Sequence, residues 1–129
     1  MEAAFKPLDS QARLYRKECF DKNAVSYFHW KQVDGEYKIA DGLIVFPTPG
    51  HTKGHQSVLV DTQKGALCVA GDVVPTIENI NDNIESSVVI NSKQVFKRFD
   101  AIRRRATFII PGHEPEIENY SENKFPRIL

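Results

Sequence analysis

The sequence is poor in cysteine, with only Cys19 and Cys68 in 129 residues, and the two are far apart and form no Cys-x-x-Cys motif. Cys68 lies within an apolar run, so we expect it to be a buried free thiol. Cysteine usage of this kind is typical of a reducing compartment, and it predicts a cytoplasmic protein.

The chain also lacks a surplus of either charge, because Lys+Arg and Asp+Glu both number 17. Nucleic acids and anionic membranes need a basic surplus, so neither is expected as the main partner. No apolar run approaches the ~20 residues of a membrane span. Residues 1–7 show no basic region followed by an apolar core, so we expect no signal peptide. The length and the ordinary globular composition predict one domain over residues 1–129.

Three apolar runs end in the same way, with a glycine followed by a side chain that can bind a metal. The run Leu43–Phe46 leads to Pro49-Gly50 and then His51. Cys68–Ala70 leads to Gly71 and Asp72, and Phe108–Ile110 leads to Pro111-Gly112 and His113. Any one of these is an ordinary turn residue, but three at the same place after a strand favour a metal site. Imidazole nitrogen and carboxylate oxygen are ligands of zinc and similar divalent ions.

These segments, namely Thr48–His55, Ala70–Asp72 and Ile110–His113, resemble the second half of the metallo-β-lactamase-fold hydrolases. The N-acyl-homoserine-lactonase-like subgroup carries a similar TPGHTxGHQS segment. The resemblance implies an α/β (α+β) fold: half of an αββα sandwich, a mostly antiparallel or mixed sheet with helices on its outer face. It implies His51 as a ligand of a first metal, Asp72 as the bridging catalytic residue and His113 as a ligand of a second. Two zinc ions are expected, with iron or manganese as alternatives.

One part of the family pattern is missing. The HxHxDH signature supplies the remaining ligands in the first half of the fold, and no HxH occurs among the four histidines of this chain. The chain thus looks like the C-terminal half of such an enzyme. We expect a metal-dependent hydrolase of the ester or lactone type, acting on a small molecule with zinc-activated water, once a second polypeptide supplies the missing half. The alternatives are an inactive fragment that self-associates and a non-catalytic binding or scaffold protein.

Three further positions bear on the site. His55 follows His51 by four residues, but the neighbouring glycines disfavour a helical ligand pair, and we expect His55 to support the site. The lactonase-like subgroup has a tyrosine about three residues after the bridging aspartate, where this sequence has Pro75. His29 lies between Phe28 and Trp30, where a position on a strand face or at a pocket wall is the commoner explanation and a role in the substrate pocket is the alternative.

The remaining elements follow from hydrophobic periodicity. Leu8–Phe20 has helical spacing, although Ala12–Tyr15 fits a short strand as well. Val25–Val33 is rich in β-formers, and Asp34-Gly35 predicts a hairpin that returns over Glu36–Ile39. Further strands are expected over Leu43–Phe46, Gln56–Asp61, Ala66–Ala70 and Thr107–Ile110.

Two segments lie between the last two strands. Asp72–Ser87 is rich in Asn and Asp and is expected to be a loop that walls the substrate site, with Glu78 and Asp82 as solvated carboxylates. Asn91–Arg105 is the clearest helix, with Asn91 as N-cap, Gln94 as its capping partner and three arginines in the last turn. Its apolar stripe consists of Val95, Phe96, Phe99 and Ile102.

Overall fold

The computed structural model describes residues 29–120 and 125–129. The chain divides into two compact units, Met1–Val33 and Asp34–Leu129. Most of the first unit lies outside the described residues, including the expected helix or strand within Leu8–Phe20. The expectation of one domain over residues 1–129 therefore stays a prediction.

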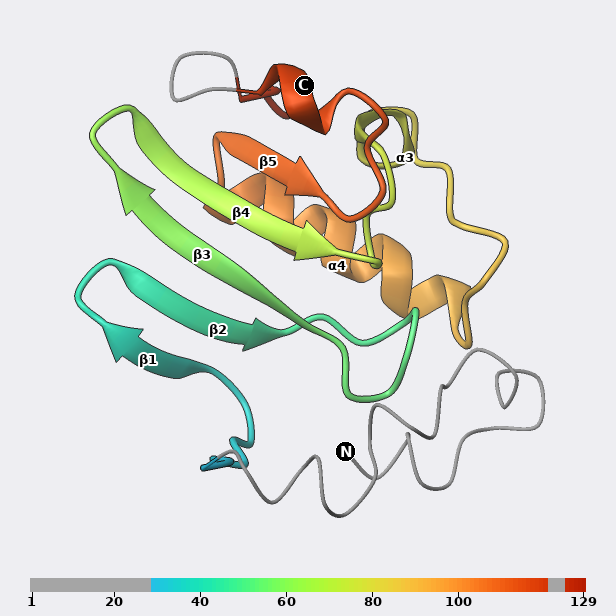
Figure 1. Cartoon of the computed structure of the whole chain (residues 1–129). Helices are drawn as coiled ribbons and strands as arrows, with labels where there is room; N and C mark the ends of the chain where they lie inside the picture. Colours follow the sequence, from blue (N-terminus) through green and yellow to red (C-terminus); the bar gives the residue numbers. More distant parts are fainter. Residues whose placement is uncertain (1–28, 121–124) are drawn as a thin grey trace. The chain divides into compact units, whose positions relative to one another are not determined.

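The second unit is built on a five-stranded mixed sheet with the order β1-β2-β3-β4-β5 (Figure 1). The first four strands form an antiparallel meander, and β5 returns parallel to β4 after a crossover through two helices. The strands are β1 (Tyr37–Ala40), β2 (Leu43–Pro47), β3 (Gln56–Thr62), β4 (Gly65–Gly71) and β5 (Phe108–Pro111). This sheet, with few helices, confirms the expected α+β class, and strands β2 to β5 match the predicted strands closely.

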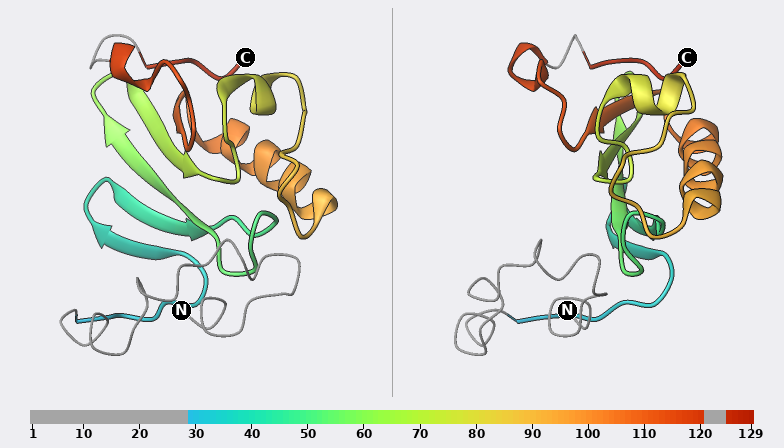
Figure 2. Two further views of the ribbon diagram at one scale, coloured as in Figure 1. Left: turned by 45° about the vertical axis from the view of Figure 1, so that its right-hand side comes forward. Right: turned by 90° about the vertical axis from the view of Figure 1, so that its right-hand side faces the viewer.

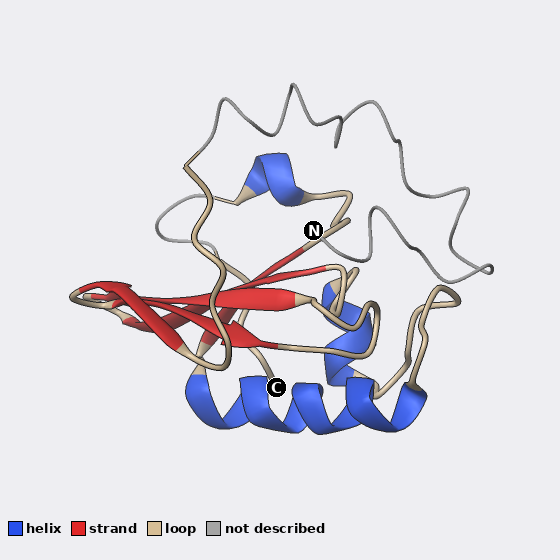
Figure 3. Cartoon of the chain, turned by 90° about the horizontal axis from the view of Figure 1, so that it is seen from below, coloured by secondary structure: helices blue, strands red, loops and turns tan. Residues whose placement is uncertain are grey.

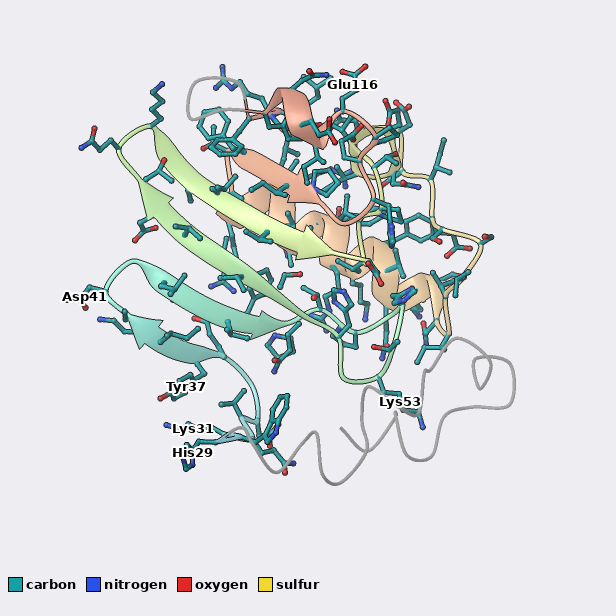
Figure 4. The ribbon with its side chains drawn as sticks, in the orientation of Figure 1. His29, Lys31, Tyr37, Asp41, Lys53 and Glu116 are labelled. Atoms are coloured by element: carbon teal, nitrogen blue, oxygen red, sulfur yellow. The ribbon has the colours of Figure 1, made fainter. Side chains whose placement is uncertain are left out.

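The expected aromatic strand is wrong in its described part, because residues 29–33 form no strand and residues 25–28 are not described. The predicted hairpin at Asp34-Gly35 is also wrong, although its return strand over Glu36–Ile39 forms as β1. The hairpin forms one turn later, at Asp41-Gly42, where Gly42 has a φ of +70° and its carbonyl accepts a hydrogen bond from the Asp61 amide. Asp41 marks this turn between β1 and β2 in Figure 4. Strand propensity is realised only where a partner strand is available, and β1 finds its partner in β2.

Helix α4 (Ser92–Arg105) forms as predicted from local signals. The Asn91 side chain accepts a hydrogen bond from the Gln94 amide at 2.9 Å, which caps the N-terminus. Val95, Phe99 and Ile102 are fully buried on the stripe that faces the sheet. Figures 2 and 3 show α4 lying along one face of the sheet.

The segment after β4 is not simply a loop, because Ile77–Asn81 forms a short helix, α3. Thr76 begins it with a capping box, in which the Asn79 side chain accepts from the Thr76 amide. Val73, Val74 and Ile80 are buried and anchor the segment in the core. The expectation of a loop was wrong because the Asn and Asp content obscured the capping pair and these buried apolar residues.

The two faces of the sheet differ in what covers them. Ile44, Leu59, Cys68 and Ile109 pack against α4 in one hydrophobic core. Strand alternation and register place the neighbouring residues on the opposite face, and these are apolar as well. Residues 125–129 lie along the free edge of β5, where the Ile109 amide donates to the Pro126 carbonyl. The residues of β2 to β5 that point away from α4 form a face called here the far face. They are Leu43, Val45, Val58, Val60, Leu67, Val69, Phe108 and Ile110.

Among the described residues, no helix has the length and apolar character needed to cross a bilayer. The cytoplasmic location stays a prediction.

Candidate metal-binding site

The loop that carries His51 is fixed against the start of α4. The Gly50 carbonyl accepts hydrogen bonds from the Ile90 and Asn91 amides at 2.8 and 3.1 Å. Gly50 has a φ of +144°, and a Cβ atom here would come within 2.6 Å of Val95 Cγ2. Only glycine allows this approach, so the Pro-Gly pair before His51 serves to dock the loop on the helix.

The His51 imidazole is oriented by a main-chain carbonyl. Its Nδ1 lies 2.6 Å from the carbonyl oxygen of Val88, which can only accept, so Nδ1 carries a hydrogen and donates it. In the neutral ring the other nitrogen, Nε2, then presents a lone pair. Nε2 lies 3.5 Å from Asp72 Oδ2. A carbonyl that holds one imidazole nitrogen while the other faces the site is the usual arrangement for a metal-binding histidine.

Asp72 lies at the end of β4, between the two predicted histidine ligands. Gly71 before it adopts a φ of +63°, which turns the chain out of the strand. Oδ2 of Asp72 faces His51, whereas Oδ1 lies 3.1 Å from Nε2 of His113. The carboxylate is half-exposed, and each of its oxygens faces a different imidazole.

The loop after β5 is hydrogen-bonded to the segment that follows Asp72. The amides of Gly112 and His113 donate to the carbonyls of Val74 and Pro75 at 3.0 and 2.8 Å. The next side chain, the buried Glu114, accepts from the Ile77 amide at 2.9 Å. Three consecutive residues thus bind the start of the α3 segment, and this places the exposed His113 imidazole beside Asp72.

The contacts at Asp72 suit a cation. The lone pair on His51 Nε2 and the carboxylate are both acceptors, so they face each other favourably only with a proton or a metal ion between them. Donor atoms around a tetrahedral zinc ion lie roughly 3.3 Å apart, since zinc–ligand bonds are about 2.0–2.1 Å. The distances of 3.5 and 3.1 Å bracket that spacing, and the nitrogen and oxygen donors are of the type that zinc accepts.

The site is not complete within the described residues. In residues 29–120 and 125–129 no group of three or more His, Cys, Asp or Glu side chains has an arrangement that holds one metal ion. The contacts form two pairs that share Asp72, and each pair offers two donors, one fewer than a catalytic zinc ion normally takes from protein. The structure brings the three predicted residues together, and their role as metal ligands stays a prediction.

His55 takes part in the site region through hydrogen bonds. Its Nε2 accepts from the Val73 amide at 3.3 Å, and its Nδ1 lies 2.8 Å from Thr48 Oγ1. Burial and, after it, the nearby His51 lower the pKa of His55, and these effects outweigh the opposing influence of Asp72. Because both ring nitrogens of His55 take part in hydrogen bonds, we expect the side chain to support the site and not to bind a metal.

The other flagged residues lie apart from this centre. Glu78 and Asp82 are exposed, as expected, and a hydrogen bond from Thr76 lowers the pKa of Glu78. Pro75, which departs from the pattern of the lactonase-like subgroup, helps to hold the site, because its carbonyl accepts a hydrogen bond from the His113 amide. The Val88 carbonyl left no signal in the sequence, because any residue supplies a carbonyl and 37 positions separate it from His51.

Comparison with known proteins finds relatives in sequence and in fold, although no family model matches the chain. An N-acyl homoserine lactonase of Bacillus thuringiensis is 27% identical over 125 residues, which cover 92% of this chain and 49% of the relative. A solved N-acyl homoserine lactone hydrolase, with the product N-hexanoyl-L-homoserine at its catalytic metal center, superposes with a TM-score of 0.71 at 23% identity. That match covers 97% of this chain and 49% of the other.

A third match, a putative metallo-β-lactamase of Thermotoga maritima, gives a TM-score of 0.60 at 24% identity, over 86% of this chain and 53% of the other. The chain thus spans about half the length of the curated relatives it matches. In sequence and in fold, it corresponds to the C-terminal half of the metallo-β-lactamase-fold hydrolases related to the N-acyl homoserine lactonases.

Proposed function

We propose that this chain provides one half of a two-metal hydrolase site, in which His51 binds a first ion, Asp72 bridges two ions and His113 binds the second. The observation that carries the proposal is the position of the Asp72 carboxylate, whose two oxygens each face a different imidazole. A carboxylate held in this way offers one oxygen to each of two ions. The expected ions are zinc, with iron or manganese as alternatives.

Each residue of this half has a definite task. His51, held by the Val88 carbonyl, presents its Nε2 lone pair without further reorientation. Asp72 supplies the negative charge that two cations require at close range, and the turn at Gly71 exposes it. When bound, the ions supply a water of lowered pKa and polarise the scissile carbonyl oxygen.

The remaining ligands are proposed to come from a second polypeptide segment that carries the HxHxDH signature. The far face supports such a partner, since it is apolar across four neighbouring strands and opposite to α4. Val69 at its centre is 37% exposed. Sheets of this kind pack face to face at about 10 Å, with their apolar side chains interleaved. A second sheet on this face would also lie near the strand ends that carry His51 and Asp72.

The substrate class follows from the relatives and is part of the proposal. The curated relatives are N-acyl homoserine lactonases, so a lactone or a similar ester is the first class to test. Pro75 replaces the tyrosine expected in that subgroup, and it therefore argues for testing esters other than acyl homoserine lactones as well.

The apolar far face favours a second candidate equally well. A chain that covers this face with another copy of itself would be an inactive, self-associating binding module. The two candidates differ in stoichiometry and metal content, which makes them separable in one measurement.

Native mass spectrometry in a volatile buffer with trace zinc tests both candidates. The chain is measured alone and after co-expression with a polypeptide that carries HxHxDH, such as the remaining half of the Bacillus thuringiensis relative. The proposal expects a one-to-one complex with two zinc ions, and it expects Asp72→Asn to lose zinc while the complex persists. Hydrolysis of N-hexanoyl homoserine lactone and of simple esters is then measured through the protons that the reaction releases.

The outcomes separate clearly. A metal-free homodimer that excludes the added half would overturn the hydrolase proposal and support the self-associating module. A complex that binds two zinc ions but hydrolyses no lactone or ester would retain the metal site and overturn the substrate class.

A further inference from the structure

His55 is held in one tautomer by its partners. Its Nε2 lies 3.3 Å from the main-chain nitrogen of Val73, which can only donate, so Nε2 must accept. A neutral imidazole that accepts at Nε2 carries its hydrogen on Nδ1. That hydrogen points to Thr48 Oγ1 at 2.8 Å.

The hydrogen-bond chain continues through two buried hydroxyl groups. Thr48 Oγ1 lies 2.8 Å from Ser57 Oγ, and Ser57 Oγ donates to the Ala70 carbonyl at 2.8 Å. Because Ser57 uses its hydrogen on Ala70, Thr48 must donate to Ser57, and Thr48 is then free to accept from His55. Each hydrogen atom in this series of hydrogen bonds therefore has a single donor and a single acceptor. Thr48 and Ser57 are 0% and 1% exposed. Such a fully satisfied buried network specifies one arrangement.

This network joins the two segments that present the proposed ligands. Thr48 lies three residues before His51, whereas Ala70 and Val73 flank Gly71 and Asp72. Gly71 approaches the ring so closely that a Cβ atom there would lie 3.1 Å from His55 Nε2. The rings of His51 and His55 also meet edge to face, with centroids 6.0 Å apart. The imidazole therefore fills the space between the His51 loop and the Asp72 turn.

We infer that His55 is a positioning residue, which in its Nδ1–H tautomer ties the turn of Asp72 to the loop of His51 and so sets where the Asp72 carboxylate points. It is not itself a metal ligand. The effect of His55 on metal binding rests on the proposed function, whereas its tautomer and its hydrogen bond to Val73 do not.

The first test measures the tautomer in the wild-type chain. Long-range proton–nitrogen NMR correlation distinguishes a protonated imidazole nitrogen from one with a lone pair. The inference expects the hydrogen of His55 on Nδ1 at neutral pH. A hydrogen on Nε2, or an averaged signal from both tautomers, would overturn it.

The second test compares two variants at position 55. His55→Leu has a similar volume without polar atoms, whereas the amide oxygen of His55→Gln can still accept from Val73. Amide exchange at Val73 is expected to be faster in His55→Leu, by up to about tenfold, and to be restored at least in part by glutamine. Equal exchange in wild type and both variants would overturn the inference. So would a uniform rise across the sheet, because it would indicate a merely structural role.

The third test uses zinc alone as probe, in competition with a chromophoric chelator. His55→Leu is expected to weaken zinc binding by roughly 10- to 100-fold, the usual effect of removing a group that orients metal ligands. Unchanged affinity in a folded His55→Leu would overturn the positioning role. If the wild-type chain and its complex bind no zinc, the proposed function fails, while the tautomer and the Val73 exchange still decide the role of His55.

Discussion

Gly112 lies against Asp72 so closely that a Cβ atom at position 112 would be 2.9 Å from Asp72 Oδ1 and 2.7 Å from the main-chain carbon of Gly71. The loop of His113 and the turn of Asp72 thus touch through main-chain atoms. No side chain fits between them, and the distance from His113 to Asp72 depends on this contact.

Gly112→Ala is therefore expected to push the two segments apart. The obstacle is main chain rather than a flexible side chain, so we expect a loss of about 1–3 kcal/mol in the free energy of unfolding, as for other overpacked sites. Zinc binding should weaken in parallel. Urea denaturation and zinc competition measure the two effects.

Gly54→Ala is the matched control for this change. A Cβ atom at Gly54 would meet no atom within 4 Å, although the residue lies in the neighbouring His51 loop. It should leave stability within about 0.5 kcal/mol of wild type, as for most surface substitutions. If Gly112→Ala were as mild as Gly54→Ala, the close approach would carry no weight.

Arg103 ties α4 to α3 and to the residues that follow it. It donates to the Ile80 carbonyl and, at 3.0 Å, to Asn83 Oδ1, and it also bonds Asp100 on its own helix. Arg103→Ala should lower the free energy of unfolding by roughly 1.5–3 kcal/mol, the range for hydrogen bonds that involve a charged group. Differential scanning calorimetry provides the measurement.

Arg104→Ala serves as its control. Arg104 is exposed, and its substitution removes the same charge from the same turn of the helix. It should change the melting temperature little. Equal effects of the two substitutions would show that helix charge, rather than the Ile80 and Asn83 contacts, accounts for the loss.

The buried thiol of Cys68 should make the stability of the protein depend on pH in the alkaline range. The thiol is fully buried, and burial raises its pKa from 9.0 to about 12. The unfolded chain releases this proton near pH 9, whereas the folded chain keeps it. The contribution of Cys68 to stability is therefore present below pH 9 and is lost as the pH rises toward 12, by at most about 1.4 kcal/mol per pH unit.

The difference between wild type and Cys68→Ala isolates this effect, because both chains share every other titrating group. The urea midpoints of wild type and Cys68→Ala, measured at pH 8, 9 and 10, should approach each other as the pH rises. A constant difference would contradict a raised pKa. In the native chain the thiol should also resist alkylation, since the thiolate is the reactive form.

How far the sequence predicted this structure depends on how local each signal is. The α4 boundaries follow from Asn91 and one apolar stripe, all within a few turns of chain. Asp34-Gly35 and Asp41-Gly42 carry the same turn signal, but a hairpin forms only at Asp41-Gly42, because residues 29–33 form no strand whereas β1 pairs with β2. Short α3 was missed because five residues give too little periodicity.

The candidate site shows the same division. His51, Asp72 and His113 were predicted from glycine-ended strands, and the sheet does bring them together at Asp72. The Val88 carbonyl and the direction of the His55 network were beyond prediction, because they depend on contacts between distant main-chain atoms.

The far face yields the last prediction, which concerns the proposed partner. Val69 projects from the middle of β4, opposite to the α4 side, and is 37% exposed. A lysine there can extend into solvent from the isolated chain, so Val69→Lys should change its stability little. A partner sheet would bury the ammonium group in an apolar interface, which costs several kcal/mol without a counter-charge.

Val69→Lys should therefore weaken association with the HxHxDH-bearing polypeptide by at least about 100-fold, equivalent to about 2.7 kcal/mol. Lys64 provides a control position, since Lys64→Ala removes a charge from the exposed β3–β4 turn, at the opposite end of the sheet from the His51 loop (Figure 1). Sedimentation velocity of the mixed chains measures both effects. Association that survives Val69→Lys would mean that the partner binds elsewhere, because a sheet packed on this face cannot avoid the central strand.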